Sequence, residues 1–368
     1  MFGLELSFIW AGIIALAVLI YVILDGFDLG VGLLFPLSKD EGERDVMMNS
    51  VAPIWDGNET WLVLGGGGLF AVFPLAYATV MPALYMPIIL MLLGLVFRGV
   101  AFEYRWRTVR GKHLWDISFF GGSLVASMCQ GIALGALVQG IEIENRAYAG
   151  GWWDWLTPFS VLTGFAVTVG YAMLGATWLN MKLEGRIQAH MRRLAWPFAI
   201  ATLVFMGLVS LWTPFLNDAF FGRWFAFPTA IFSFLVPALV AAAVYGLFHG
   251  LQRHWDVTPF LCALALFVLG FIGIGISFYP YIVPSSLTIV EAAAPDSSLK
   301  FALVGTLVLL PMILSYTIYT YWVFRPRRGL PLMRRNWMTR TGWFVLIWVL
   351  SVAALGLVAY GIRLMIMP

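Results

Sequence analysis

Ten long apolar runs follow one another along this chain, and most reach the roughly 20 residues that a helix needs to cross a membrane. Charged residues make up only 11% of the 368 residues and apolar residues 61%, whereas soluble domains average about 25% charged. We therefore expect an all-α polytopic membrane protein. The predicted spans are residues 6–35, 55–76, 79–103, 114–140, 157–181, 194–215, 225–250, 257–280, 300–323 and 341–366.

The order of the runs suggests how these helices pack. Runs one to four and five to eight can each form a four-helix bundle, with the ninth helix at the periphery and the tenth at the C-terminus. The run at 55–76 is the weakest, because glycines at 65–68 and Pro74 lower its helix propensity. The expected domains are a membrane domain, a basic linker and a single terminal helix, at residues 1–325, 326–340 and 341–368.

Lysine and arginine residues gather in alternate loops. All but four of the 22 Lys and Arg residues lie in or beside the loops that follow the odd-numbered runs. Because cytoplasmic loops carry an excess of Lys and Arg, this pattern places the N-terminus in the periplasm and these loops in the cytoplasm. The net charge of +3 therefore reflects topology and gives no reason to expect a nucleic-acid partner. The four exceptions are Arg146, Arg223, Lys300 and Arg363.

Six ionisable side chains lie toward the cytoplasmic end of the first three runs. An ionised group at the bilayer centre costs at least ~2.5–3.5 kcal/mol on insertion scales, so such residues usually have a function. Carboxylates beside one arginine in a low-dielectric layer can bind and release protons. We expect a proton path there. The six residues are Asp25, Asp28, Asp56, Glu59, Arg98 and Glu103.

A structural role is the alternative for the same residues. Asp25 or Asp28 would then pair with Arg98, and Asp56 would cap the second helix, with Glu59 completing a capping box. Three carboxylates on two adjoining helices exceed what one cap and one arginine need. We therefore expect the three aspartates to take part in proton movement, whereas both roles stay open for the two glutamates.

The fourth run carries polar side chains that would extend a proton path deeper into the membrane. Hydroxyl and amide groups both donate and accept hydrogen bonds, which a relay requires. We expect such a relay from Ser123, Ser127 and Gln130.

Residues that would bind haem or a metal ion are poorly placed for it. All four histidines lie at predicted loops or helix ends, whereas haem ligands in a membrane must face one another inside the bilayer. The two cysteines are isolated within predicted helices and have no second cysteine at metal-ligand spacing. We expect no haem or metal bound by this chain's own residues. The residues concerned are His113, His190, His249, His254, Cys129 and Cys262.

Several sequence segments resemble a single family. They include DGFDLGVG at 25–32, NSVAPIWDGNETWL at 49–62, FRGVAFEYR at 97–105 and YIVPSS at 281–286. These segments resemble subunit II of the cytochrome bd-type quinol oxidases, in unbroken order from residue 1 to about residue 325. Their amino-acid sequences are most similar to the cyanide-insensitive branch of that family.

The resemblance implies a haem-free subunit of a terminal oxidase that reduces oxygen to water in an aerobic respiratory chain. It implies a heterodimer in the bacterial cytoplasmic (inner) membrane, in contact with membrane lipids. The partner, subunit I, carries haem b558, haem b595 and haem d together with the quinol site. Some members of the family also hold a structural quinone in subunit II, and small single-helix subunits accompany some complexes.

The resemblance also implies roles for individual residues. The positions matching Trp55 and Arg98 are linked to the integrity of the haem and quinone sites, and we group Glu59 with them as structural support. Other positions line or neighbour a proposed proton route toward haem d in subunit I. These positions match Asp25 or Asp28, Asp56 and Glu103. At the position of Glu103, some relatives have the shorter Asp.

The C-terminal part departs from the family pattern. Subunit II usually ends after nine helices, near Tyr321 and Trp322 here, whereas this chain continues through a basic linker into a tenth apolar run. That run resembles the small one-helix accessory subunits of bd oxidases. We expect a fused accessory subunit, with a plain additional membrane anchor as the alternative.

Two other functions fit some of the same features. An ion-coupled secondary transporter also uses interrupted helices and intramembrane acids, but its sites gather near the bilayer midplane, and the acids here lie at one face. A purely structural partner for assembly of a haem subunit is the third possibility. It predicts that neutral replacements of the acids are tolerated whenever the complex forms.

Overall fold

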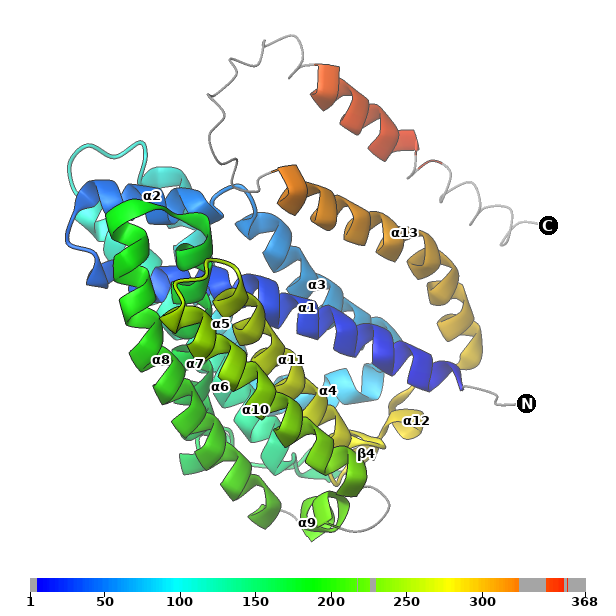
Figure 1. The fold of residues 1–368 in the computed structure, drawn as a ribbon. Helices are drawn as coiled ribbons and strands as arrows, with labels where there is room; N and C mark the ends of the chain where they lie inside the picture. The colour runs from blue at the N-terminus through cyan, green and yellow to red at the C-terminus, as the bar shows by residue number, and fades with distance from the viewer. Residues whose placement is uncertain (1–4, 217, 226–229, 324–341, 354–355, 357–368) are drawn as a thin grey trace. The chain divides into compact units, whose positions relative to one another are not determined.

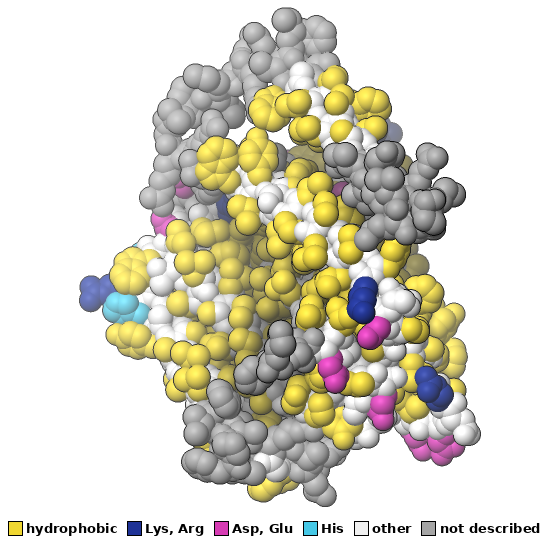
Figure 2. Space-filling model, turned by 90° about the vertical axis from the view of Figure 1, so that its right-hand side faces the viewer, with side chains coloured by type: hydrophobic (Ala, Val, Ile, Leu, Met, Phe, Trp, Pro, Cys, Tyr) yellow, Lys and Arg dark blue, Asp and Glu magenta, His cyan; other side chains and the backbone are white. Residues whose placement is uncertain are grey.

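The computed structural model describes residues 5–216, 218–225, 230–323, 342–353 and 356, and these residues are predominantly α-helical (Figure 1). The chain divides into two compact units, Met1–Lys300 and Phe301–Pro368. Among the described residues, eight helices are long and apolar enough to cross a membrane. The prediction of an all-α, multi-pass membrane fold is confirmed. Hydrophobic side chains also cover most of the face drawn in Figure 2, where charged side chains are few.

Most of the helices belong to the first unit. Two short antiparallel strand pairs lie in its loops, β1 (Ile143–Glu144) with β2 (Ala147–Tyr148) and β3 (Tyr281–Val283) with β4 (Leu287–Thr288). The helix α13 (Asp296–Val323) begins at the end of this unit and continues into the second, which also contains a helix at Gly342–Ala353. The other helices are α1 (Leu6–Leu34), the 3-10 helix η1 (Phe35–Leu37), α2 (Glu41–Val51), α3 (Trp55–Val72), α4 (Pro74–Ala83), α5 (Tyr85–Tyr104), α6 (Lys112–Gln139), α7 (Pro158–Lys182), α8 (Gly185–Trp212), the 3-10 helix η2 (Thr213–Phe215), α9 (Asp218–Phe225), α10 (Ala230–Gln252), α11 (Thr258–Phe278) and α12 (Ile289–Ala292).

The first unit is organised around α1, α6 and α7. Helix α1 packs against α3, α6 and α7, while α6 lies against both α5 and α7. Helix α7 also packs against α8 and α11, and α11 pairs with α10. The core is densest where the second half of α1, from Asp25 onward, meets the second half of α7. This region places the polar residues of α1 deep inside the helix bundle.

The second predicted span, residues 55–76, is wrong as a single helix. It forms α3 and the start of α4, separated at Phe73, whose φ of −125° and ψ of 62° are not helical. Pro74 explains the break, because proline lacks an N–H and disfavours the helical conformation of the preceding residue. The glycines at 65–68 stay within α3. The predicted start of the third span at residue 79 is also wrong, since α4 continues to Ala83.

Other boundaries differ less, except that α8 begins early and that α2, α9 and α12 lie in predicted loops. Helix α8 begins at Gly185, well before the predicted start at residue 194. The helix α2 in the first loop was not predicted, and Asp40 begins it by accepting a hydrogen bond from the Glu43 N–H at 3.1 Å. The predicted linker at 326–340 lies outside the described residues, and so does part of the tenth run at 341–366.

Two glycines allow α1 and α7 to pack backbone against backbone. A Cβ atom at Gly30 would lie 1.9 Å from the carbonyl oxygen of Tyr171, and one at Gly175 would lie 2.3 Å from the carbonyl carbon of Gly30. Neither position can accept a side chain unless the helices move apart. This contact therefore fixes the polar second half of α1 against α7.

Replacing Gly30 with alanine is expected to lower the free energy of unfolding by about 1–3 kcal/mol, the usual cost of overpacking. Gly12 on the same helix is the matched control, because a Cβ there meets no atom within 4 Å. Gly12→Ala should be neutral or slightly stabilising, since alanine favours helix over glycine. Thermal unfolding of the purified variants in detergent measures both effects. Equal transitions for the two variants would contradict the close α1–α7 contact.

Candidate functional site

Arg98 on α5 is the centre of a buried charge cluster that also includes side chains from α1 and α3. Its side chain is 0% exposed. The Nη1 atom donates to Asp25 Oδ1 at 2.7 Å and to Glu59 Oε1 at 3.0 Å, and Nη2 lies 3.8 Å from Asp28 Oδ2. Three carboxyl groups therefore face one guanidinium, and both Asp25 and Asp28 lie within ion-pair distance of Arg98.

Asn58 on α3 is a member of the cluster that sequence reasoning missed. It is buried, and its Nδ2 atom donates to Asp28 Oδ2 at 2.7 Å and to the Leu24 carbonyl oxygen at 3.4 Å. An amide inside a charged segment gives little signal by itself. Its position directly before Glu59 in the resembled segment 49–62 was the available clue.

Exposure of the acids increases toward the start of α3. The side chains of Asp25 and Asp28 are 1% and 0% exposed, whereas that of Glu59 is 24% exposed. Asp56, one helical turn before Glu59, is exposed. Glu59 therefore links the buried part of the cluster to the surface near Asp56.

Trp55 contributes to the cluster through an aromatic neighbour. Its ring stacks on Phe102, with 4.8 Å between centroids and 10° between planes. The Phe102 ring in turn lies 5.8 Å from the Arg98 Cζ atom, within range of a cation–π contact. Trp55 thus supports Arg98 indirectly, by fixing the ring beside it.

Several buried polar atoms of the cluster have no hydrogen-bond partner among the described residues. They are Asp25 Oδ2, Asp28 Oδ1, and the Nε and Nη2 atoms of Arg98. Buried polar groups in proteins are nearly always paired, often with ordered water. The cluster therefore has spare capacity to bind water molecules.

A second polar group extends from α1 to α6 and α7. Tyr21 lies one turn before Asp25 on α1, and its hydroxyl oxygen accepts a hydrogen bond from Gln130 Nε2 at 2.6 Å. The Tyr171 hydroxyl donates to Gln130 Oε1 at 2.8 Å. Among the described hydrogen bonds, Gln130 is therefore the predicted relay residue that bonds to α1, one turn before Asp25. The two tyrosines were not predicted, because aromatic residues are common in apolar helices.

The predicted relay serines are buried but bond to their own helix. Ser123 Oγ donates to the Phe119 carbonyl oxygen at 2.7 Å, and Ser127 Oγ donates to the Ser123 carbonyl oxygen at 2.5 Å. Ser123 also packs against Gly32, where a Cβ would lie 2.0 Å from its Oγ atom. None of the hydrogen bonds in the described part of the chain joins either serine to the cluster.

Two other predicted site residues lie at the surface. Glu103 is exposed at the end of α5 and takes part in none of the ion pairs among the described residues. Asp56 does not cap α3, because this helix begins after Ile54 and has no side-chain cap. The alternative of a capping box formed by Asp56 and Glu59 is therefore wrong. The roles given to Glu59 and Glu103 from the sequence, structural support and a place on the proton route respectively, stay predictions.

An unpredicted ion-pair network joins α2 to the end of α5 and the start of α6. The side chain of Arg105 is 0% exposed, and it pairs with Asp45 Oδ1 through Nη1 and with Asp116 Oδ1 through Nε, both at 2.5 Å. Arg44 Nη1 lies 2.7 Å from the other Asp116 oxygen, and Lys112 lies 3.2 Å from Asp45. From sequence these cations had indicated only the orientation of the chain.

This network gives stability an acid dependence. Burial alone would raise the pKa of Asp45, but hydrogen bonds from Arg105 and Lys112 lower it below its usual value. The stabilisation is then complete above the unfolded-state pKa of about 3.9 and is lost as the pH falls through the lower folded-state pKa. Asp45→Asn is expected to be less stable than wild type near neutral pH, and the difference should shrink in acid. Thermal unfolding against pH, with the exposed Glu184→Gln as control, measures this; a constant difference would contradict it.

The histidines of the described residues lie near helix ends or in a loop. In the ranges that the structure describes, no group of three or more His, Cys, Asp or Glu side chains could hold a metal ion. His249 stacks on Tyr245 at 5.5 Å between ring centroids, near the end of α10, and its ring also contacts Trp255. His113 and His254 are exposed.

Comparisons with known proteins agree on one family for residues 6–324. The family model for cytochrome bd terminal oxidase subunit II matches residues 6–324, and a model for proteins of unknown function, DUF2474, matches residues 335–367. The chain is 32% identical to cytochrome bd-I ubiquinol oxidase subunit 2 of Escherichia coli (strain K12), over 86% of this chain and 93% of that protein. It is 31% identical to cytochrome bd ubiquinol oxidase subunit 2 of Bacillus subtilis (strain 168), over 87% and 96%. Its fold is similar to the structure of bd oxidase from Geobacillus thermodenitrificans, with a TM-score of 0.70 and 17% identity, covering 86% of this chain and 98% of that one.

Proposed function

This chain belongs to the cytochrome bd terminal oxidase subunit II family, and on that basis we propose that it acts within a membrane-bound quinol oxidase that reduces oxygen to water. Membership of this family implies a partner, subunit I, and haem in the complex. We assign haem b558, haem b595 and haem d to subunit I, as the resemblance of the sequence to this family implies. The multi-pass fold and the family support a place in the bacterial cytoplasmic membrane.

The buried cluster around Arg98 supports a role in proton supply, because the reduction of oxygen to water consumes protons. Three carboxyl groups against one guanidinium leave uncompensated negative charge when all are ionised, and such charge is costly in a low-dielectric layer. Proton binding relieves that cost. The increase in exposure from Asp25 through Glu59 to Asp56 supports entry of protons at the start of α3.

Buried polar groups beyond the cluster support a continuation of the path. Tyr21 and Tyr171 hold Gln130 between them, and unpartnered atoms of Asp25 and Asp28 can bind water. We assign Ser123 and Ser127 a weaker part in this path, because their hydroxyl groups bond to their own helix.

A purely structural role in assembly is the second candidate, favoured by the direct ion pairs of Arg98. It differs from the first in one consequence, which is that neutral replacements of the acids would support full turnover in an assembled complex. The transporter alternative has no support from the family to which the chain belongs.

Co-purification tests the oxidase assignment. The chain is purified in mild detergent, every accompanying polypeptide is identified, and a reduced-minus-oxidised visible spectrum is recorded. We expect haem b and haem d bands together with a larger, histidine-bearing partner. A colourless preparation without a partner would contradict the assignment.

We propose that the C-terminal segment is a fused accessory subunit. Residues 335–367 match a different family model from the rest of the chain, as a fused module would. Deleting residues 328–368 should leave membrane insertion intact but lower the yield of haem-loaded complex, and co-expression of the segment as a separate chain should restore it. Unchanged haem content after the deletion would favour a plain membrane anchor.

A further inference from the structure

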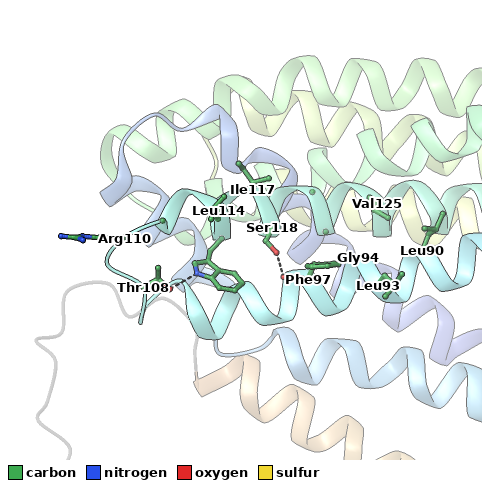
Figure 3. Close-up of a pocket in the computed structure, with 14 residues that line it drawn as sticks. Leu90, Leu93, Gly94, Phe97, Thr108, Arg110, Leu114, Ile117, Ser118 and Val125 are labelled. Carbon is green, nitrogen blue, oxygen red and sulfur yellow. Dashed lines mark hydrogen bonds between the residues drawn. The ribbon is translucent and has the colours of Figure 1, made fainter.

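A long apolar groove runs between α5 and α6, ending near the loop at 105–111 that joins them (Figure 3). Its volume is about 830 Å³, within the range of roughly 300–1,000 Å³ typical of small-molecule sites. Leu90 and Val125 line the part farthest from the loop, and Thr108 and Leu114 line the part nearest to it. The groove takes no part in the charge cluster described above.

Glycines shape the groove. A Cβ at Gly94 would lie 2.8 Å from the Gly122 carbonyl oxygen, and one at Gly122 would lie 2.4 Å from that of Gly94. The two helices therefore touch through their backbones, and the larger side chains on either side form walls. Gly121 also lines the groove, and a Cβ there meets nothing within 4 Å. A larger side chain at Gly121 would occupy the groove without displacing the protein.

The loop end of the groove carries one charge. The polar groups there are bonded within the protein: Trp115 Nε1 donates to Thr108 Oγ1 at 2.8 Å, and Ser118 Oγ donates to the Phe97 carbonyl oxygen at 2.9 Å. Arg110 takes part in none of the ion pairs in the described part of the chain, and Figure 3 shows its side chain extending outward past the end of the groove. The groove is therefore mostly apolar, with one cation at its loop end.

The length of the groove matches one leaflet of a membrane. From Leu114 to Val125, helix α6 rises by roughly 16–17 Å at 1.5 Å per residue, close to half of the ~30 Å hydrocarbon core. Basic residues at the cytoplasmic ends of membrane helices attract anionic lipids. We propose that this groove binds an anionic phospholipid, with one acyl chain along α5 and α6 and the headgroup phosphate paired with Arg110.

Lipid binding to the full-length chain, purified with the subunits that accompany it, tests this proposal. Spin-labelled phosphatidylglycerol and spin-labelled phosphatidylcholine are titrated separately and followed by electron paramagnetic resonance. We expect Arg110→Gln to reduce the preference for phosphatidylglycerol over phosphatidylcholine about fivefold. This factor corresponds to the ~1 kcal/mol that one basic residue contributes at an anionic membrane surface. Gly121→Leu should weaken binding of both lipids.

Helix α8 provides the matched controls. Arg186 is an exposed arginine outside the groove, and Gly207 is a glycine whose Cβ would meet nothing within 4 Å. Arg186→Gln and Gly207→Leu should bind both lipids as wild type does.

Four outcomes would overturn the proposal. An unchanged lipid preference in Arg110→Gln would show that Arg110 does not contact the headgroup. Unchanged binding in Gly121→Leu would show that the lipid binds outside the groove. Displacement of labelled phosphatidylglycerol by ubiquinone, with no effect of Arg110→Gln, would identify a quinone site. Exclusion of both labels from the purified assembly would identify a contact surface for another subunit. None of these readouts depends on proton transfer through the charge cluster.

Discussion

Replacing Arg98 with glutamine is expected to prevent accumulation of the haem-loaded complex. The guanidinium is fully buried and faces Asp25, Asp28 and Glu59. Its removal leaves three carboxyl groups without a cation, and breaking a buried ion pair in this way costs about 3–5 kcal/mol. That is a large part of the roughly 5–15 kcal/mol by which folded proteins are stable. Haem content per milligram of purified membrane protein measures the loss.

Arg98→Lys separates charge from geometry. Lysine restores the positive charge but not the planar fork that donates from one nitrogen to both Asp25 and Glu59. We therefore expect partial recovery of the haem-loaded complex. A wild-type yield from Arg98→Gln would show that the cluster does not hold α1, α3 and α5 together.

Replacing Glu59 with glutamine is expected to lower oxygen consumption while leaving the complex assembled. The amide oxygen of glutamine can still accept the hydrogen bond from Arg98, so the geometry is kept, but the side chain can no longer carry a proton. Positioned proton-transfer groups contribute roughly 10²–10⁴-fold to rates, and partial bypass through water would still leave a loss of at least about tenfold. Turnover per haem with quinol as reductant measures it.

Two further variants accompany this test. Glu184→Gln, an exposed acid directly before α8, should retain wild-type turnover. Asp56→Asn should show a smaller decrease than Glu59→Gln, because an exposed carboxylate is more easily replaced by water. Full turnover in Glu59→Gln would favour the structural role in assembly.

The sequence indicated the cluster because charge is rare in apolar helices. Asp25, Asp28 and Arg98 stand out for that reason, and the structure brings them together. Glu103 stood out equally but lies at the end of α5, where a shift of one turn takes a residue from the protein interior to the surface. Sequence spacing gives the face of a helix, but its depth depends on where the helix ends.

Polar partners in uncharged segments were harder to predict. Tyr21 and Tyr171 resemble ordinary aromatic residues of apolar helices, and only their contact with Gln130 distinguishes them. Ser123 and Ser127 show the reverse case, because serine in a helix often bonds to the carbonyl group four residues earlier.

The fold class followed from hydropathy, but one helix break did not. Pro74 was recognised as a weakness, yet hydropathy continues across it, so α3 and the start of α4 were predicted as one span and the rest of α4 was assigned to the next. The packing of α1 against α7 through Gly30 and Gly175 was also unpredicted. The sequence does not distinguish glycines that contact a neighbouring helix from glycines such as Gly12, where an added Cβ would meet no atom within 4 Å.

Proton uptake by the complex reconstituted in vesicles tests the central claim most directly. Complexes oriented with the start of α3 facing the interior are supplied with quinol and oxygen, and an enclosed pH-sensitive dye follows the interior. We predict that wild type makes the interior alkaline as oxygen is consumed, and that Glu59→Gln slows both processes in parallel. An unchanged rate of alkalinisation in Glu59→Gln, at full oxygen consumption, would contradict proton entry through this cluster.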